Sequence, residues 1–428
     1  MRKDAVLKTL HLYAGRMISY IRRQPHNFKV MLARRSIQAV GMNLAAQYNS
    51  LYATALGASP VHVGSLQSVG NGMSAFASIL AGWFIDRSGT RTIFLVGAGM
   101  LVASGLLFFA APHWVFLYAG IMFYYMGLRI TCTCCSVTGA IELVNTERAT
   151  GRGLCRTLAS IVTITTPMLA AWFVAACGGL NEAGLRPLYG LQAGVFALVF
   201  LLLLAFFRDR KVAVEDRPAQ GVLSAFVSVF ARGRGRIIRL LLLASLLDVP
   251  FNMTMPFIPL FAHQLKGADE YVIGGIMVAR NVTPLLFSII AGRLADRRGR
   301  KMLLYLVSPL IYAGFLSLIF AQGTAVLLLA GLLFGFTNIA VGIGQAMAAE
   351  VVPKEQMGRW LGMISLVRAA LSVPAPLLGG FIWDAVSPEA VFLAAIAIDL
   401  VVRLPLLASI PETLHLSLDR SGDDAPQG

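Results

Sequence analysis

The sequence predicts an all-α integral membrane protein with twelve transmembrane helices, arranged as two pseudo-symmetric six-helix bundles. Hydrophobic residues make up 57% of the 428 residues and charged residues only 13%, whereas about a quarter of a soluble domain is charged. The apolar residues gather in runs of about 20, the length that a helix needs to cross the hydrocarbon core. The chain also repeats itself at an offset of 210 residues, which indicates one six-helix unit used twice.

A basic segment, residues 1–33, precedes the first apolar run. Within it Leu7, Leu10 and Met17 alternate with Lys8 and Arg16, a pattern typical of an amphipathic helix that lies on an anionic membrane surface. A disordered basic tail is the alternative. Charges interrupt the apolar residues and no small-residue cleavage site follows, so a cleavable signal peptide is not expected.

The runs then define two bundles and a linker. The N-terminal bundle is expected over residues 34–207, a linker over 208–236, the C-terminal bundle over 237–410 and a polar tail over 411–428. Each bundle holds six spans, whose bounds the apolar runs give to within a few residues. The spans are 34–56, 62–85, 92–111, 115–140, 154–177 and 188–207, then 237–261, 271–291, 302–321, 325–349, 360–383 and 389–410.

The positive charge is distributed unevenly about these spans. Of the 36 lysines and arginines, 30 fall on one side or at the span ends on that side, four (Arg129, Arg280, Arg368 and Arg403) lie deep inside spans, and two, Arg186 and Lys266, fall on the other side. This asymmetry predicts that the basic side, with both termini, is cytoplasmic. The net charge of +15 therefore indicates topology and not a nucleic-acid interface, which would place aromatic or base-reading residues beside the cations. The expected surroundings are a lipid bilayer and a small-molecule or ion substrate, with the chain as a monomer.

Two copies of one short motif mark turns between adjacent runs. Residues 82–91 read GWFIDRSGTR and residues 292–301 read GRLADRRGRK. The first glycine of each copy allows close packing at a helix end, and the last suits a tight turn with positive φ. An acid there can pair with cations or with a helix N-terminus of the other bundle. The candidate gating residues are Gly82, Asp86, Arg87, Gly89 and Arg91, and Gly292, Asp296, Arg297, Gly299 and Arg300.

A second paired feature follows the fourth and tenth spans. Glu142 with Arg152 after the fourth span is echoed by Glu350 with Arg359 after the tenth, and these four are gating candidates as well. Together with the motif Gly-x3-Asp-Arg-x-Gly-x-Arg, this arrangement resembles the major facilitator superfamily over residues 34–410; the first copy carries Thr90 where that family often has a basic residue. The resemblance implies a central site between two rocking bundles. It also implies that Asp86 faces the eleventh helix, with Arg359 as its partner in an inner gate. A simple topology signal from a basic loop is the alternative.

Charged residues inside the spans are costly, about 2.5–3.5 kcal/mol each on insertion scales, and so they are site candidates. Arg129 lies about 20 Å along the fourth helix from Glu142 and resembles the helix-4 arginine of proton-coupled facilitators, although Cys132 and Thr133 replace the usual glutamine and glycine. It is either a substrate anchor or proton relay, or a structural donor to carbonyls. Asp248 and Arg280 are expected to pair, as a coupling site or a permanent structural pair. Arg368 is a third candidate for the cavity.

Polar residues add to this set. Asp399 and Arg403 stand four apart on the last helix and are expected to satisfy each other. Pro250, Pro256 and Pro259 are expected to distort the seventh helix. Asparagines and glutamines either line a cavity or join helices. The candidates for the cavity lining are Asn43, Gln47, Asn71, Asn252, Asn281 and Asn338.

No enzyme, cofactor or metal site is predicted. Triads, phosphate loops and paired glycosidase acids are absent from the sequence. Cys132 and Cys135 share a helix face and Cys155 is on the next helix, but no histidine or carboxylate accompanies them. The cysteines therefore favour small-residue helix packing over a soft-metal site.

The predicted function is secondary active transport of a small, possibly anionic solute across the cell inner (plasma) membrane, coupled to protons or another ion. Three alternatives stay open. A drug–proton antiporter is disfavoured because the region around Pro167 lacks the glycines of the antiporter motif. An iron or iron-chelate permease of the magnetosome membrane is suggested by similar length and a similar basic extension. A transport-inactive scaffold or sensor is the third.

Overall fold

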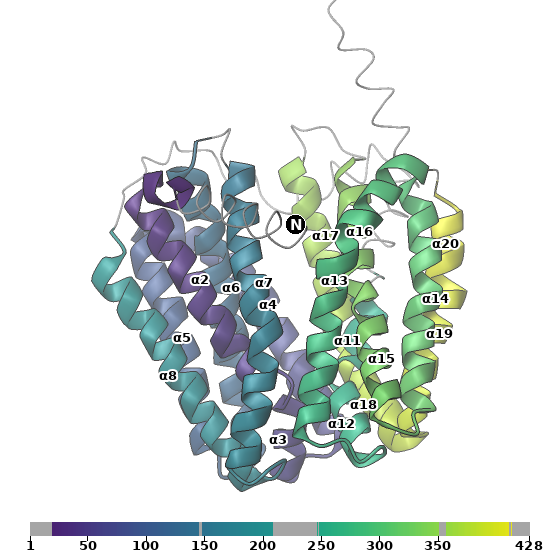
Figure 1. Ribbon diagram of the computed structural model, residues 1–428. Coiled ribbons are helices and arrows are strands. Elements are labelled where there is room, and N and C mark those ends of the chain that lie inside the picture. Colours follow the sequence, from purple (N-terminus) through teal and green to yellow (C-terminus); the bar gives the residue numbers. More distant parts are fainter. Residues whose placement is uncertain are drawn as a thin grey trace, which may run out of the picture.

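The computed structural model describes residues 19–144, 148–208, 246, 248–350, 357–410 and 412. For residues 79, 82, 83, 85–88, 140, 148, 149, 152, 156, 348–350, 357–363 and 366 it describes the backbone alone. The predicted amphipathic segment therefore lies largely outside the described residues, as do most of the linker and the tail. Throughout the described part the regular structure is helical (Figure 1).

The N-terminal bundle follows the first six predicted spans. The first predicted span is broken at residues 46–48, and α2 begins at His26, eight residues before the apolar run, because Asn27 and Arg34 are buried against neighbouring helices and extend the helix beyond that run. The helices are α2 (His26–Ala45), α3 (Asn49–Ala55), α4 (Pro60–Ser88), α5 (Thr90–Ala110), α6 (Phe116–Glu142), α7 (Arg148–Ala176) and α8 (Glu182–Phe206).

The C-terminal bundle is more often broken. The seventh predicted span divides near Pro256, as its prolines predict, and the eleventh divides before Pro374. The elements are α11 (Asp248–Thr254), α12 (Phe257–Gln264), α13 (Glu270–Arg298), α14 (Arg300–Ile319), α15 (Thr324–Phe334), α16 (Phe336–Glu350), α17 (Met357–Ser372), α18 (Pro374–Ala385), α19 (Pro388–Ile398), the π-helix η2 (Asp399–Arg403) and α20 (Leu404–Ala408).

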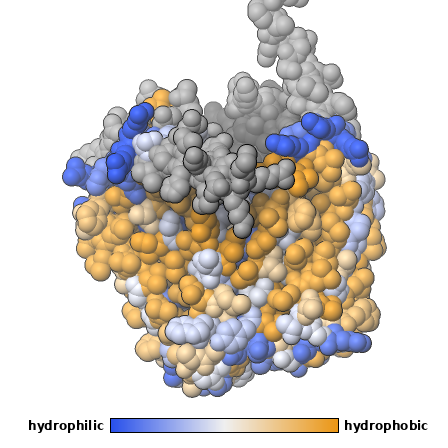
Figure 2. All heavy atoms as spheres, viewed as in Figure 1, coloured by the Kyte–Doolittle hydropathy of each residue, from blue (hydrophilic) through white to orange (hydrophobic). Residues whose placement is uncertain are grey.

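The surface confirms a membrane protein. Seven stretches of helix in the described part are each long and apolar enough to cross a bilayer. Figure 2 shows apolar side chains forming a broad band across the visible face, with polar residues gathered above and below it. A band of this kind matches the hydrocarbon core of a membrane.

The bundles contact one another at one end of the molecule. We call the end that carries the turns at Gly89 and Gly299 the motif end, and the opposite end the far end. The start of α4 packs on α18, and the start of α13 packs on α7. A Cβ added to Gly64 would lie 2.3 Å from the carbonyl oxygen of Pro376, and one added to Gly274 would lie 3.0 Å from that of Pro167. The far end is therefore shut by close backbone contacts, toward which the two bundles converge (Figure 1).

Paired hydrogen bonds accompany these contacts. Asn71 donates to the Ser372 carbonyl over 3.0 Å, and its repeat equivalent Asn281 donates to the Thr163 carbonyl over 3.2 Å. Each carbonyl stands four residues before a proline, Pro376 or Pro167, which has no N–H to bond it. Each proline thus frees an acceptor for an asparagine of the opposite bundle. The internal repeat predicted from the sequence operates as two equivalent clamps.

Candidate functional site

A cavity of ≈ 340 Å³ lies between the two bundles. The N-terminal wall comes from α3, α4, α5 and α6, and the C-terminal wall from α11, α12 and α13. Its polar side chains are Asn49, Ser50, Gln67, Asn71, Tyr124, Tyr125, Asn252 and Arg280. Apolar walls with a few convergent polar groups are typical of a small-molecule site.

Arg280 is the charged residue of this lining. Its Nη1 lies 2.8 Å from the Met255 sulfur, and its guanidinium carbon lies 5.1 Å from the centre of the Phe251 ring. Among the described residues no carboxylate pairs with it, and its buried Nε has no hydrogen-bond partner. Weak acceptors and an aromatic face leave most of the hydrogen-bonding capacity of a guanidinium unused. The cavity therefore presents an uncompensated cation.

The repeat places Gly70 at the position equivalent to Arg280. A Cβ on Gly70 would lie 2.5 Å from the ring of Tyr125, which fills that space from α6. The Tyr125 hydroxyl in turn accepts a 2.5 Å hydrogen bond from Gln67. The N-terminal wall of the cavity is therefore neutral and aromatic where the C-terminal wall is cationic.

A chain of amides crosses the cavity from one bundle to the other. Gln67 donates to Asn71 over 3.3 Å, and Asn71 donates to Asn252 over 3.4 Å. Asn252 donates to the backbone carbonyl of Asp248 over 2.7 Å. Two predicted lining residues, Asn71 and Asn252, are thus in the cavity and in contact.

The predicted pair of Asp248 with Arg280 is wrong. Asp248 instead forms an ion pair with Arg368 of α17, whose Nε lies 2.5 Å from the carboxylate, and the two side chains are 13% and 27% exposed. Asp248 lies at the start of α11, which packs on α17, whereas the Arg280 side chain lies against Phe251 and Met255. Of the four charged residues predicted for the site, three are in the C-terminal bundle, and two of these, Asp248 and Arg368, form a pair.

Arg129 lies apart from the central cavity. Its Nη2 donates to the Ser78 hydroxyl of α4 over 3.1 Å, and its buried Nε has no partner in the described part of the chain. It does not belong to the lining of the ≈ 340 Å³ cavity. In this conformation its contact fits the structural alternative better than a substrate anchor.

Four other predicted lining residues lie outside the cavity. Asn43 donates to the Ala39 carbonyl and to Thr163, while Gln47 is buried and donates to the Pro167 carbonyl over 3.1 Å. Both join α2 to α7. Asn281 belongs to the clamp described above, and Asn338 is exposed on α16. In this conformation these four are not among the residues that line the ≈ 340 Å³ cavity, and their predicted part in the site stays a prediction.

The motif turns have the predicted backbone. Gly89 has φ +82° and Gly299 has φ +100°, and each precedes the first residue of a helix. Close packing at Gly292 is not observed, since a Cβ there would meet open space. Arg91 donates to the Leu204 carbonyl over 2.8 Å, and Arg297 is exposed. In the second copy Asp296 faces its own neighbour Arg300 at 3.6 Å.

A carboxylate outside the predicted motif caps α14. The two oxygens of Glu412 accept the backbone N–H groups of Arg300 and Lys301 over 3.0 and 3.2 Å, and Lys301 Nζ donates to the carbonyls of Ala408 and Ile410. This places an anion on the positive end of a helix dipole. It fixes the end of the last helix to the second motif turn.

Glu412→Gln is expected to lower the free energy of unfolding by about 0.3–2 kcal/mol, because the amide brings no charge to the helix N-terminus. Thermal unfolding of the purified protein measures this loss. Asp296→Asn is the control, since its exposed 3.6 Å ion pair should contribute close to nothing. Equal loss in the two variants would contradict the capping role.

Several predicted gating residues lie outside the described side chains. They are Gly82, Asp86, Arg87, Arg152, Glu350 and Arg359. Glu142, another predicted gating residue, is described, and its carboxylate accepts a 2.9 Å hydrogen bond from Asn27. The inner gate of Asp86 with Arg359 therefore stays a prediction.

Four of the five cysteines lie within helices, Cys177 lies in the turn after α7, and all are free thiols. Cys134 is fully buried against the apolar core of α2, α4, α5 and α8, and Cys155 is buried against Phe28, Met31 and Leu154. Each is surrounded by apolar side chains. This environment fits their predicted packing role.

Several residues that line the cavity were not predicted from the sequence. Tyr124 and Tyr125 are flanked by apolar residues, and Phe251 and Met255 look like ordinary lipid-facing or core positions. Gln67 carried a usable signal, because it stands four residues before Asn71 and shares its helix face.

Comparison with known proteins identifies the family. The Major Facilitator Superfamily profile matches residues 36–279 and again residues 240–417. The chain belongs to this superfamily. The fold agrees: a point mutant of the nucleoside transporter NupG aligns with TM-score 0.73 and 16% identity over 89% of this chain and 99% of that one. A POT family transporter in complex with 5-aminolevulinic acid aligns with TM-score 0.71 and 14% identity over 91% and 98%.

Curated relatives from this superfamily share parts of the sequence. The multidrug resistance protein MdtG of Proteus mirabilis is 35% identical over 35% of this chain and 38% of its own length. The MdtG of Dickeya zeae is 23% identical over 76% and 78%, and the class B tetracycline resistance protein of Escherichia coli is 23% identical over 41% and 44%. The chain thus matches less than half the length of the first curated relatives. The superfamily identifies the chain as a transport protein and not an enzyme.

Proposed function

We propose that the protein is an ion-coupled secondary transporter that moves a small organic anion through the central cavity by alternating access. The observation that carries this proposal is Arg280, a cation that lines the cavity and has no carboxylate partner among the described residues. A substrate carboxylate or similar group would supply the acceptors that Met255 and Phe251 do not. Tyr124 and Tyr125 on the opposite wall would hold the apolar body of such a solute.

The ion pair of Asp248 with Arg368 is the coupling site in this proposal. One helical turn beyond it, Asn252 and the Ser372 carbonyl both bond Asn71 of the other bundle. A proton on Asp248 would weaken its hold on Arg368 and loosen α11 from α17. Because the Asn71 clamp rests on both helices, protonation would bias the closure of the far end.

The motif end is cytoplasmic in this proposal, since the lysines and arginines gather there. The cell inner membrane is the proposed location. The conformation described, shut at the far end, is then inward-facing. Rocking of the bundles about the central cavity would close the motif end and open the far end.

Arg280→Gln is expected to weaken the binding of anionic ligands at least tenfold, because a buried charge-assisted hydrogen bond is lost. A thermal-shift screen of the purified protein against metabolite, metal-chelate and drug panels supplies the ligands, and calorimetry measures the loss. Arg280→Lys should retain part of the affinity. Retained anion binding in Arg280→Gln would contradict the proposal.

Drug export is the second candidate. The observation in its favour is the similarity to proteins named for multidrug and tetracycline resistance. The same screen separates drug export from anion transport. Cationic drugs would raise the unfolding temperature of an exporter of such drugs, and this rise would not depend on the charge of residue 280. A transport-inactive scaffold would show neither response.

A further inference from the structure

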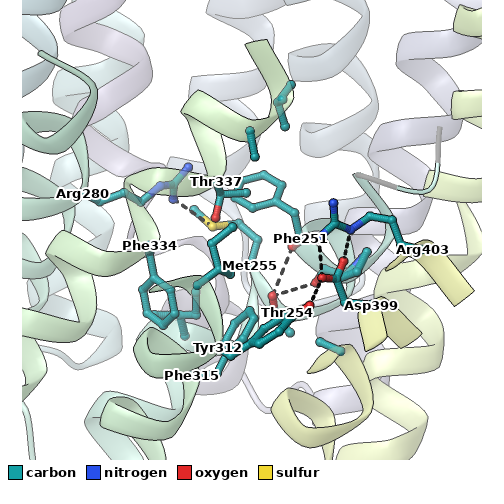
Figure 3. Close-up of a pocket in the computed structure, with 16 residues that line it drawn as sticks. Phe251, Thr254, Met255, Arg280, Tyr312, Phe315, Phe334, Thr337, Asp399 and Arg403 are labelled. Carbon is teal, nitrogen blue, oxygen red and sulfur yellow. Dashed lines mark hydrogen bonds and ion pairs between the residues drawn. The ribbon is translucent and has the colours of Figure 1, made fainter. Parts of the chain in front are cut away.

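A second, smaller pocket lies inside the C-terminal bundle (Figure 3). Its walls come from α11, α12, α13, α14, α15, α16, α19 and η2, and its volume is ≈ 40 Å³. At about 10–15 Å³ for each water, this is room for about three waters or one small chemical group. We call it the inner pocket.

The inner pocket shares a wall with the central cavity. Phe251, Met255 and Arg280 line both spaces. Arg280 lies at one side of the inner pocket, and Asp399 and Arg403 lie at the other (Figure 3). The contact of Arg280 with a thioether is weak, so an acceptor offered in the central cavity would draw the guanidinium away from Met255. A group held at Arg280 therefore lies at the wall that the central cavity shares with the inner pocket.

The remote side of the inner pocket is a buried polar cluster. Asp399 accepts hydrogen bonds from Tyr312 and from Arg403, and Arg403 also donates to Ser308. The predicted pairing of Asp399 with Arg403 is thus confirmed. The two charges cancel, and Tyr312 adds none. A second charge brought into this cluster would lose its hydration without a free counter-ion.

One donor of the cluster is unused. Arg403 is 3% exposed, and its Nη1 has no hydrogen-bond partner among the described residues. The arginine lies at the end of a π-helix, Asp399–Arg403, a rare geometry that is frequent at functional sites. A buried N–H without an acceptor is costly. The inner pocket thus has apolar walls and is also lined by an arginine with one donor that lacks an acceptor.

We propose that the inner pocket is a deep subsite that takes a small, uncharged substituent of the substrate with a hydrogen-bond acceptor, such as a ketone or ether oxygen. The substrate's anionic group stays at Arg280 in the central cavity. This inference rests on the proposed function, and it narrows the substrate to anions with an apolar body and a neutral acceptor at the opposite end. The acceptor would satisfy Arg403, and the apolar walls would exclude a charged substituent.

The test uses three probes and the full-length protein in detergent. The probes are benzoate, 4-isopropylbenzoate and 4-acetylbenzoate; the last two have nearly the same shape and differ in the acceptor. Calorimetry is expected to give about tenfold tighter binding for 4-acetylbenzoate than for 4-isopropylbenzoate, because the acceptor meets a charged donor. Thr337→Leu, which fills the inner pocket from α16, should remove this gain and leave benzoate binding unchanged. Thr337→Val, of equal size to threonine, should keep the gain.

The outcomes separate the two proposals. The deep subsite is overturned if the two substituted probes bind equally, or if 4-acetylbenzoate still binds more tightly in Thr337→Leu. In either case, benzoate binding that depends on Arg280 still upholds the anion site. If none of the probes binds, the anion site is wrong and the subsite with it. If Thr337→Leu also loses benzoate binding, Ala340→Leu provides a second variant, because it fills the same pocket from one helical turn away. The comparison of the two substituted probes in the wild-type protein then still tests the deep subsite.

Discussion

Asp248→Asn is expected to remove the pH dependence of far-end closure, because an amide cannot change charge and holds Arg368 as weakly as a protonated carboxyl would. In the native protein the carboxylate lies 2.5 Å from the guanidinium, with 13% and 27% of the two side chains exposed. Breaking a largely buried pair by removing one partner costs about 3–5 kcal/mol, a figure that exposure here will reduce. The effect should be the largest of any single change around the cavity.

Hydrogen–deuterium exchange of residues 60–72 and 374–385 measures this closure without knowledge of the substrate. In the wild-type protein, exchange corrected for its intrinsic rate should rise as the pH falls and Asp248 takes up a proton. In Asp248→Asn it should be high and the same at every pH. The double variant with Arg368→Gln should cost less than the sum of the single changes, with a coupling energy of about 0.5–3 kcal/mol. Full additivity would show that the pair is not a unit.

The sequence predicted those features that are set locally. The turns at Gly89 and Gly299 have the expected positive φ because the motif leaves a single residue to reverse the chain. The seventh predicted span divides near Pro256 into α11 and α12, and Asp399 pairs with Arg403 because both lie on one helix face. Each of these follows from residues within about one turn of each other. The resemblance to the superfamily was also predicted from such local motifs.

Partners far apart in the chain were not predictable in the same way. Asp248 and Arg368 are 120 positions apart, and choosing Arg368 over Arg280 requires knowing that α11 packs on α17 along this face. Asparagines are equally ambiguous, since Asn71 both lines the cavity and joins the bundles, while its repeat equivalent Asn281 only joins them. The sequence did contain one overlooked clue. Pro167 and Pro376 each free a carbonyl that an asparagine of the other bundle then bonds.

Gly64→Ala is expected to open the far end, because the new methyl group would lie 2.3 Å from the Pro376 carbonyl oxygen. That neighbour is backbone, held by the helix that follows Pro374, so it cannot rotate away as a side chain can. Overpacking of this kind costs about 1–3 kcal/mol, which is about a fivefold to 150-fold shift in population at 1.4 kcal/mol for each factor of ten. The cost falls on the conformer that is shut at the far end, and the protein should shift toward its opposite conformer.

Glycines on the same helices provide a graded series. A Cβ on Gly274 would lie 3.0 Å from the Pro167 carbonyl oxygen, and one on Gly72 would lie 3.9 Å from Val373, which is ordinary contact. Gly274→Ala should therefore open the far end less than Gly64→Ala does. Gly72→Ala should not open it, and should raise thermal stability slightly because alanine favours helix over glycine by about 0.5–1 kcal/mol.

Hydrogen–deuterium exchange at residues 374–385 should follow this order of distances, with Gly64→Ala fastest, then Gly274→Ala, then Gly72→Ala at the native rate. The order matters more than any single value, because all three changes add the same methyl group to a helix. If Gly72→Ala exchanged as fast as Gly64→Ala, helix propensity or general destabilisation would explain the result, and backbone contact would not be what shuts the far end. An unchanged rate in Gly64→Ala would mean that α4 and α18 do not approach this closely in the membrane.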